Sequence, residues 1–364
     1  MMIYLDNAAT TKILPQVREK MVEMAEVFGN PSSLHGIGMA ARREVEAARG
    51  IIAGCFGDGE VYFTSGGTEA NAIALNVRGR VLVSRMEHPS VLENLRKNRE
   101  IEIGYIDVGT DGKIDLRNFD GMLGDDVVMV SCMQVGNETG VVQPIAEMRE
   151  IMRKSGSAAI LHVDAVQGFG KISGRIEADM VTVSAHKIGG LKGTGALWVR
   201  KGVKVESLSH GGGQEKGIRA GTENVLGIAC FGVATEERIR EIERNYEHVR
   251  GLNRCVREGL QVEHEILSAD DGSPYILNIS FGGVMGQTVM NSMEMRGIYI
   301  GIGAACAANK ASQLSEGLQA MGIGAEAIRG SVRLSFAAEN TMEEVEAAVV
   351  ALNEVVEGLR RIRR

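Results

Sequence analysis

Between residues 60 and 200, short runs of β-branched and aliphatic residues alternate with longer segments whose apolar residues recur at helical spacing. Such runs are typical of strands buried on both faces, and the segments between them of covering helices. We therefore expect an α/β domain with a mainly parallel seven-stranded sheet. Its strands are predicted near residues 60–64, 80–84, 101–106, 126–132, 159–163, 179–183 and 195–200. Helices are predicted at residues 68–76, 89–98 and 144–154.

The pattern changes after residue 222. Residues 222–260 predict one or two long helices with a charged face, which lead into a second region. There the pattern predicts strands at 275–281, 298–302 and 331–336 and helices at 287–296, 313–321 and 341–359. A chain of 364 residues is longer than a single hydrophobic core usually supports. We assign residues 13–255 to a large domain, and residues 1–12 and 256–364 to a smaller α+β domain.

Composition narrows the class of protein. The net charge of −7 gives the molecule no general attraction to nucleic acid or anionic lipid. No apolar run approaches bilayer-spanning length and the N-terminus does not resemble a leader, so a soluble, cytoplasmic protein is expected. The five cysteines are an odd number without a C-x-x-C pair, which argues against a disulfide framework and a structural zinc site.

Two polar side chains stand where predicted apolar strands stop. Residues 183–190 read VSAHKIGG and place Lys187 after a strand, and residues 160–167 read ILHVDAVQ and place Asp164 in the same way. Ligands of α/β proteins bind at these strand ends. A lone lysine there is usually a solvated loop residue, but its amine also forms imines with aldehydes. Asp164 suits a protonated pyridine nitrogen, with a structural ion pair or a metal as alternatives.

Further strand ends carry side chains of matching chemistry. Residues 63–71 read FTSGGTEAN, a strand, turn and helix start that favour phosphate binding. A glycine-rich turn alone is weak evidence, and the spacing of nucleotide-binding loops is absent from it. Asn137 can bond a phenolic oxygen and His88 can stack on a ring, although a lone histidine is as often inert. Together these residues predict that Lys187 carries pyridoxal phosphate (PLP) as a Schiff base.

Taken in order, these segments resemble the cysteine desulfurase family, PLP-dependent proteins of the class-V aminotransferase group with the fold type I architecture of aspartate aminotransferase. The resemblance covers nearly the whole chain, and the joint order of its motifs is specific. It rests on residues 4–11 (YLDNAATT), 29–33 (GNPSS), 66–69 (GGTE), 87–88 (EH), 137–140 (NETG), 162–167 (HVDAVQ), 184–187 (SAHK), 211–215 (GGGQE), 219–222 (RAGT) and 330–333 (GSVR).

The resemblance implies a role for each matching residue. Lys187 holds the cofactor and then acts as the base at Cα, Asp164 pairs with the pyridine nitrogen, and His88 stacks on the ring. The remaining implied contacts are Asn137 and Gln167 to the phenolic oxygen; Gly67, Thr68, Ser184, His186 and the second subunit's Thr222 to the phosphate; and Asn30 and Arg333 to the substrate carboxylate.

Residues 299–310 read YIGIGAACAANK, a stretch that we expect to pack loosely and move. Cys306 resembles the sulfur-accepting cysteine of family members with a long loop, and an inert buried thiol is the alternative. The usual preceding serine is Ala305, and the usual GPKG after the lysine reads GLKG at residues 190–193. The resemblance implies that Cys306 takes sulfur from L-cysteine as a persulfide and that L-alanine is released.

The implied partners are L-cysteine, a second copy in a homodimer, and a sulfur acceptor such as an iron–sulfur scaffold or a tRNA-thiolation enzyme. No resident metal is expected, with Cys306 a candidate transient ligand of an iron–sulfur cluster. A selenocysteine lyase, an aminotransferase or another lyase would share the fold, but Cys306 argues against a plain aminotransferase. A non-catalytic sulfur-relay protein is a rival of another class, against which Lys187, Asp164 and His88 argue.

Overall fold

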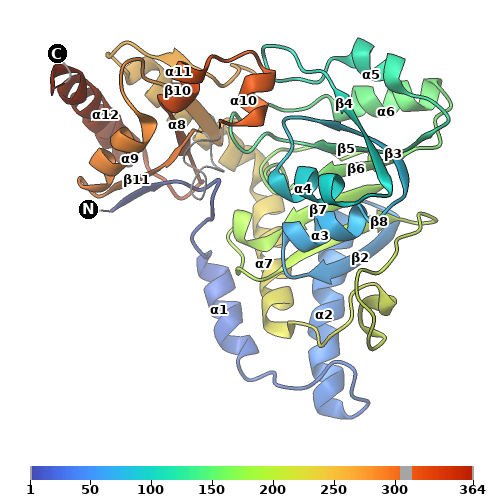
Figure 1. The fold of residues 1–364 in the computed structure, drawn as a ribbon. Helices are drawn as coiled ribbons and strands as arrows, with labels where there is room; N and C mark the ends of the chain where they lie inside the picture. Colours follow the sequence, from blue (N-terminus) through green and yellow to red (C-terminus); the bar gives the residue numbers. More distant parts are fainter. Residues whose placement is uncertain (1, 304–313, 363–364) are drawn as a thin grey trace.

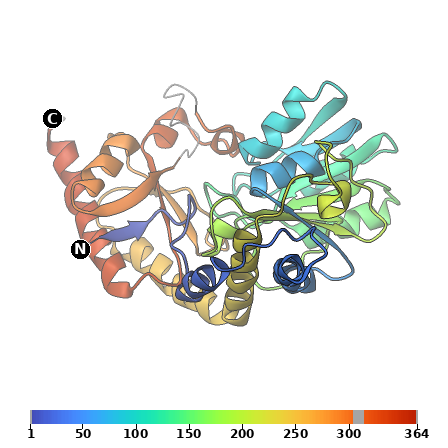
Figure 2. The ribbon, with the colours of Figure 1, turned by 90° about the horizontal axis from the view of Figure 1, so that it is seen from below.

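The computed structural model describes residues 2–303 and 314–362, which form two β-sheets with separate hydrophobic cores. In Figures 1 and 2 the smaller sheet and its helices lie to one side of the larger sheet. The predicted mixed α/β fold is confirmed. The predicted domain boundary after residue 255 falls inside helix α8 (Ile242–Gly259), which buries Val249, Leu252 and Val256 in the second core.

The larger sheet has seven strands in the order β2-β8-β7-β6-β5-β3-β4. Strand β8 runs antiparallel to both of its neighbours, and the other pairs are parallel. The strands are β2 (Gly59–Thr64), β3 (Gly79–Ser84), β4 (Ile101–Ile106), β5 (Val127–Met133), β6 (Ile160–Asp164), β7 (Met180–Ser184) and β8 (Gly195–Arg200). All seven strands predicted from the sequence are present, with bounds that differ by one residue at most.

Helices cover both faces of this sheet. One face packs against α1 (Pro15–Met24), α2 (Gly36–Gly54), α5 (Leu116–Met122), α6 (Ile145–Lys154) and α7 (Val225–Arg240). The other face packs against α3 (Gly67–Ala74) and α4 (Pro89–Lys97). Two short 3₁₀ turns, η1 (Ala185–Lys187) and η2 (Gln214–Gly217), lie at the end of β7 and in the loop before α7.

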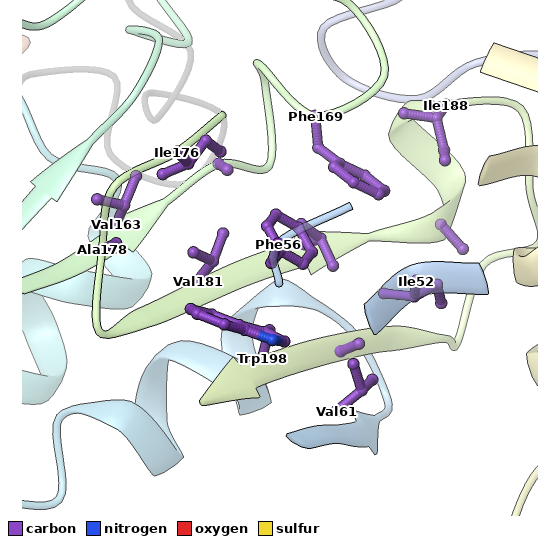
Figure 3. Close-up of a cluster of buried hydrophobic side chains, with 14 of the residues drawn as sticks. Ile52, Phe56, Val61, Val163, Phe169, Ile176, Ala178, Val181, Ile188 and Trp198 are labelled. Carbon is purple, nitrogen blue, oxygen red and sulfur yellow. The ribbon is translucent and has the colours of Figure 1, made fainter. Parts of the chain in front are cut away.

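Aromatic side chains close the core beneath β7 and β8 (Figure 3). The ring of Phe56 lies between Phe169 and Trp198, with centroid distances of 5.4 and 5.6 Å. All three residues are at most 4% exposed. Burial of each such side chain contributes about 1.5–3 kcal/mol, so this cluster anchors β8 and the turns after β6 and thereby the strand ends that carry the polar residues.

The smaller sheet has the order β1-β11-β12-β10-β9. Its strands are β1 (Ile3–Leu5), β9 (Glu265–Ile266), β10 (Ile276–Ser280), β11 (Ile298–Ile302) and β12 (Ser331–Ser335). The helices of this region are α8, α9 (Gly286–Glu294), α10 (Glu316–Ala320), α11 (Ala325–Arg329) and α12 (Met342–Ile362). As predicted, the chain start returns to this region, because β1 pairs with β11. None of the helices in the described residues has the length and apolar character needed to cross a bilayer.

The segment after β1 ties the two sheets together. Ala8 donates its N–H to Ser335 Oγ at 2.8 Å, on the small sheet. A few residues later, Thr11 donates both its N–H and its hydroxyl to the carbonyl of His186, at the end of β7. The segment therefore passes directly beside Lys187 and brings backbone carbonyls from the small sheet to the edge of the large one.

Candidate active site

The carboxyl ends of β3, β5, β6 and β7 meet at one edge of the large sheet, and a cavity of about 340 Å³ opens there. Most of the site residues predicted from sequence line it. They are Gly67, Thr68, His88, Asn137, Asp164, Gln167, Ser184, His186, Lys187 and Arg333. The chain thus brings together residues from four strand ends, the start of α3 and the small sheet.

Lys187 lies in η1, immediately after β7. Its Nζ donates to the backbone carbonyls of Ala8 at 2.5 Å and Ala9 at 3.0 Å. Burial, with a smaller contribution from the Arg333 guanidinium, lowers the pKa of Lys187 from 10.5 to about 8, against the opposing pull of Asp164 and Asp6. A substantial fraction of this amine is therefore neutral near pH 8, and the neutral amine is the form that reacts with an aldehyde.

Asp164 ends β6 and is 6% exposed. Its Oδ2 accepts from Asn71 Nδ2 at 2.8 Å, and its Oδ1 accepts from the N–H of Val166 at 3.0 Å. The two donors fix the plane of the carboxylate at the wall of the cavity. A buried carboxylate held in this way suits a cationic ring nitrogen.

His88 is held by the start of α4. It stands before Pro89, which restricts it to an extended backbone, and its side chain caps the helix. Nδ1 accepts from the Ser90 N–H at 3.1 Å and lies 2.8 Å from Ser90 Oγ. Because Nδ1 accepts from the backbone N–H, it carries no proton, so the Ser90 hydroxyl can only donate to it and the proton of the neutral ring lies on Nε2. Burial lowers the pKa of His88, against the pull of Asp164, which favours the neutral form of the ring.

At the start of α3 the cavity presents hydrogen-bond donors that suit an anion. The Gly66 cap of α3 has no side chain to bond the first N–H groups of the helix, and Gly67 and Thr68 line the cavity. A Cβ on Gly67 would lie 2.8 Å from Val166 Cγ2, so only glycine fits this approach. Ser184 Oγ is buried and has no hydrogen-bond partner among the described residues. The start of α3 and the unpaired hydroxyl of Ser184 together suit a phosphate group.

Arg333, on β12, reaches the cavity from the small sheet. Its Nη1 donates to the Asn137 carbonyl at 2.8 Å and its Nη2 to Asp6 Oδ1 at 2.9 Å. Nε is buried and unpaired among the described residues. A nearly buried guanidinium with an unused donor suits recognition of a substrate carboxylate.

Three predicted residues are not placed in this cavity. Asn30, in the loop between α1 and α2, is exposed and accepts from the Ser32 N–H, so within one chain it does not meet Arg333. Thr222 is also exposed outside the cavity of its own chain. Cys306 lies outside the described residues. Within residues 2–303 and 314–362, no group of three or more His, Cys, Asp or Glu side chains could hold a metal ion.

Sequence reasoning missed two features of the site. Asn71, which holds Asp164, lies three residues after Thr68 in α3 and therefore on nearly the same helix face, a spacing that could have marked it. The carbonyls of Ala8 and Ala9 could not be found in this way, because backbone acceptors leave no mark in the sequence.

The donor set fits PLP. The amine that is partly neutral near pH 8 matches its aldehyde, and the buried carboxylate matches its ring nitrogen. The imidazole matches the face of its ring, and the anion site with the unpaired hydroxyl matches its phosphate. Lys187, Asp164, His88 and Ser184 would hold these four parts.

Comparison with known proteins agrees with this chemistry. The family model described as aminotransferase class-V matches residues 3–348. Cysteine desulfurase IscS 1 of Archaeoglobus fulgidus is 38% identical over 99% of this chain and 98% of its own. A solved NifS-like protein superposes with a TM-score of 0.92 at 32% identity, covering 98% of this chain and 100% of its own. A second, described as SspA in complex with cysteine, has a TM-score of 0.81 at 27% identity over 93% of this chain and 100% of its own.

The match spans nearly the full length of both chains and includes the segments that build the cavity. The chain therefore belongs to the class-V aminotransferases and, within them, to the PLP-dependent cysteine desulfurases.

Proposed function

We propose that this enzyme converts L-cysteine to L-alanine and transfers the sulfur to its own Cys306 as a persulfide. The observation that carries the proposal is the convergence of Lys187, Asp164 and Arg333 on one cavity. The solved relative described in complex with cysteine supports the choice of substrate. When bound, PLP supplies an electron sink that weakens the bonds around Cα of an attached amino acid.

In this proposal the residues of the chain divide the work. Arg333 binds the carboxylate of L-cysteine, with Asn30 as a further predicted contact. The neutral amine of Lys187 takes the Cα proton, because burial holds its pKa near 8 and Ala8 and Ala9 keep it at the cavity wall. His88 stacks on the ring of PLP. Asn137 and Gln167 contact its phenolic oxygen. The phosphate contacts are Gly67, Thr68, Ser184 and His186.

Cys306 performs the distinctive step. Its thiolate attacks the sulfur of the bound substrate, so that an S–S bond forms while the Cβ–S bond breaks with its electron pair retained on carbon. That carbon then takes up a proton, Cα regains the proton held by Lys187, and the product is released as alanine. The persulfide on Cys306 carries the sulfur onward, and a reductant releases it as sulfide.

We further propose a homodimer in which Thr222 of one subunit contacts the phosphate in the other. Large apolar side chains on the projecting α1–α2 region support it, since Phe28 is 80% exposed and Leu34 is 90% exposed (Figure 1). Thr222 is exposed in a single chain and can therefore serve a neighbour. Phe28→Asp combined with Leu34→Asp should give a monomer in sedimentation velocity, and an unchanged dimer would contradict this interface.

The sulfur acceptor belongs to the same proposal. We place it among iron–sulfur scaffolds and tRNA- or cofactor-thiolation proteins of the cytoplasm, since a persulfide is passed on by attack of another thiolate. We also propose the division into a large domain at residues 13–255 and a small one at 1–12 and 256–364.

The test of the proposed activity uses PLP-loaded protein with L-cysteine and a thiol reductant. Alanine and sulfide are expected in equal amounts, and Cys306→Ala should abolish both. Protein that fails to acquire visible absorbance with PLP, or a Cys306→Ala variant with full activity, would contradict the proposal.

A further inference from the structure

Lys171 is a buried lysine behind the cavity that has no part in the chemistry above. It lies in the turns after β6, four residues after Gln167, and is 6% exposed. Its Nζ donates to Gln167 Oε1 at 3.2 Å and lies 5.7 Å from the ring centroid of Tyr275. The ion pairs formed by the described residues do not include Lys171. Among those residues, the one hydrogen bond of its side chain goes to Gln167, which lines the cavity.

The surroundings of Lys171 are unfavourable for an ammonium group. Burial, followed by the nearby cations Lys187, Arg238 and Arg333, lowers the pKa of Lys171 to about 7. A buried lysine without a carboxylate costs stability, whereas an apolar side chain of similar volume would not. A costly residue beside a binding cavity is a candidate for a functional role.

The hydrogen bonds of Gln167 indicate what that role is. Its Nε2 donates to the carbonyl oxygen of Ala8 at 2.9 Å, and a carbonyl can only accept, so the amide nitrogen faces Ala8 and the amide oxygen faces Lys171. The same Ala8 oxygen accepts from Lys187. Lys171, Gln167, Ala8 and Lys187 therefore form one continuous chain of hydrogen bonds along the cavity wall.

In this series of hydrogen bonds, Lys171 supplies a donor that Gln167 Oε1 would otherwise lack. Gln167 is 5% exposed, and a buried amide oxygen without a donor is destabilising. Without that donor, the Gln167 amide would rotate until its oxygen accepted a hydrogen bond from another group. With it, one N–H of Nε2 is held on Ala8 and the second remains available to the cavity that Gln167 lines.

We propose that Lys171 is a positioning residue, which fixes the Gln167 amide so that one N–H is available to the phenolic oxygen of PLP. The inference rests on the proposed function, in which Gln167 contacts that oxygen. Lys171 touches neither cofactor nor substrate and acts through Gln167 alone. Its removal should therefore reproduce the loss of Gln167.

The test is a double-mutant cycle on the PLP-loaded full-length protein, with Lys171→Met, Gln167→Ala and the double variant. The readout is the midpoint of the pH titration of the visible absorbance. Loss of one N–H donor leaves more negative charge on the phenolic oxygen, which favours protonation of the neighbouring Lys187 nitrogen. Each single variant should raise the midpoint by roughly 0.5 to 1 unit, and the double variant by no more than the larger single shift. Release of PLP on dilution should be about 3 to 10 times faster in each.

A second variant separates hydrogen bonding from charge and serves if Lys171→Met does not fold. Lys171→Gln keeps an N–H donor without a positive charge, so its midpoint should stay close to that of the wild type. Lys20→Met is the matched control, because Lys20 is a partly buried lysine of α1 paired with Glu23 and Glu44, away from the cavity. It should leave the absorbance titration unchanged.

The outcomes distinguish this inference from the function on which it rests. Wild-type protein without a PLP band would overturn both. If the wild type binds PLP normally and Gln167→Ala shifts the titration midpoint, three results would overturn the inference alone. The midpoint of Lys171→Met could equal that of the wild type, or its shift could add fully to that of Gln167→Ala. The third is a midpoint shift in Lys171→Gln as large as that in Gln167→Ala.

Discussion

Asn71 donates from Nδ2 to Oδ2 of Asp164 at 2.8 Å, and the same nitrogen donates to Ser90 Oγ at 2.8 Å. Ser90 in turn holds the ring of His88, the N-cap of α4, through its N–H and its hydroxyl. A single fully buried amide on α3 therefore orients both the carboxylate and the imidazole that line the cavity. We therefore expect Asn71 to support the site although it lies behind Asp164 and His88.

Replacement of Asn71 by alanine should lower kcat/KM for L-cysteine roughly 10- to 100-fold, because the bond that it loses goes to a charged group. The variant should still acquire visible absorbance with PLP, since Lys187 is untouched. Asn76→Ala is the control, because Asn76 lies beyond the end of the same helix and its side chain, among the described residues, bonds the Glu206 carbonyl alone. Equal activity of the two variants would show that Asn71 does not support catalysis.

Capture of PLP by the apoprotein should follow the ionisation of Lys187. Burial lowers the pKa of this lysine to about 8, and only the neutral amine attacks an aldehyde, so the capture rate should rise with pH to a plateau with a midpoint near 8. Stopped-flow absorbance on mixing with PLP measures it. Lys187→Ala should show no such phase, while Lys192→Ala, an exposed neighbour, should behave as the wild type. A rate that climbs steadily beyond pH 10 would be inconsistent with a buried amine.

Arg333→Ala should raise KM for L-cysteine roughly 100-fold, because a charge-assisted pair with the carboxylate is lost. Arg333→Lys should be intermediate, since an ammonium lacks the guanidinium fork. The sharper test compares L-cysteine with cysteamine, which has no carboxylate. The wild type should discriminate strongly between them and Arg333→Ala hardly at all. Retained discrimination in the alanine variant would move carboxylate recognition to another residue.

Glu87 should make stability depend on pH. Burial raises its pKa from 4.5 to about 8, although the Met133 N–H and the Ser84 hydroxyl bond its Oε1. The folded state therefore holds the proton more tightly than the unfolded state. This stabilising contribution is complete below about pH 4.5 and is lost as the pH rises through about 8.

The matched variant is Glu87→Gln, which keeps an oxygen acceptor but cannot ionise. Its Tm relative to the wild type should increase steadily from pH 5 to pH 8.5, by several degrees in total. Glu93→Gln on the exposed face of α4 should show no such trend. A Tm difference that stays constant with pH would mean that Glu87 is ionised in the folded protein.

The strands were predictable because β5, β6 and β7 are buried along nearly their whole length and read as continuous apolar runs. Helices α1 and α2 were not predicted. A helix that packs on one side only is recognised by a polar face, and exposed apolar residues such as Val22, Ile37 and Met39 interrupt that face in α1 and α2. The strand β9 was also missed, because two residues are too few to show a period.

The site was predictable where a polar side chain interrupts an apolar strand, as at Asp164 and Lys187. Residues that support these from behind, such as Asn71 and Lys171, were not, because their partners are distant in sequence or belong to the backbone. Lys171 follows Gln167 by four residues, but the segment after β6 is a series of turns, so helical spacing could not be assumed. Cys306 remains a prediction from sequence and family resemblance.

The central claim is that Lys187 activates L-cysteine and Cys306 receives its sulfur. The most direct measurement is a single turnover of PLP-loaded protein with ³⁵S-labelled L-cysteine in the absence of reductant, followed by peptide mass spectrometry. The account predicts one alanine for each labelled sulfur bound, with the label on the peptide that contains Cys306 and absent from Cys306→Ala and Lys187→Ala. Alanine formed without label on that peptide, or label on Cys306 in the Lys187→Ala variant, would contradict it.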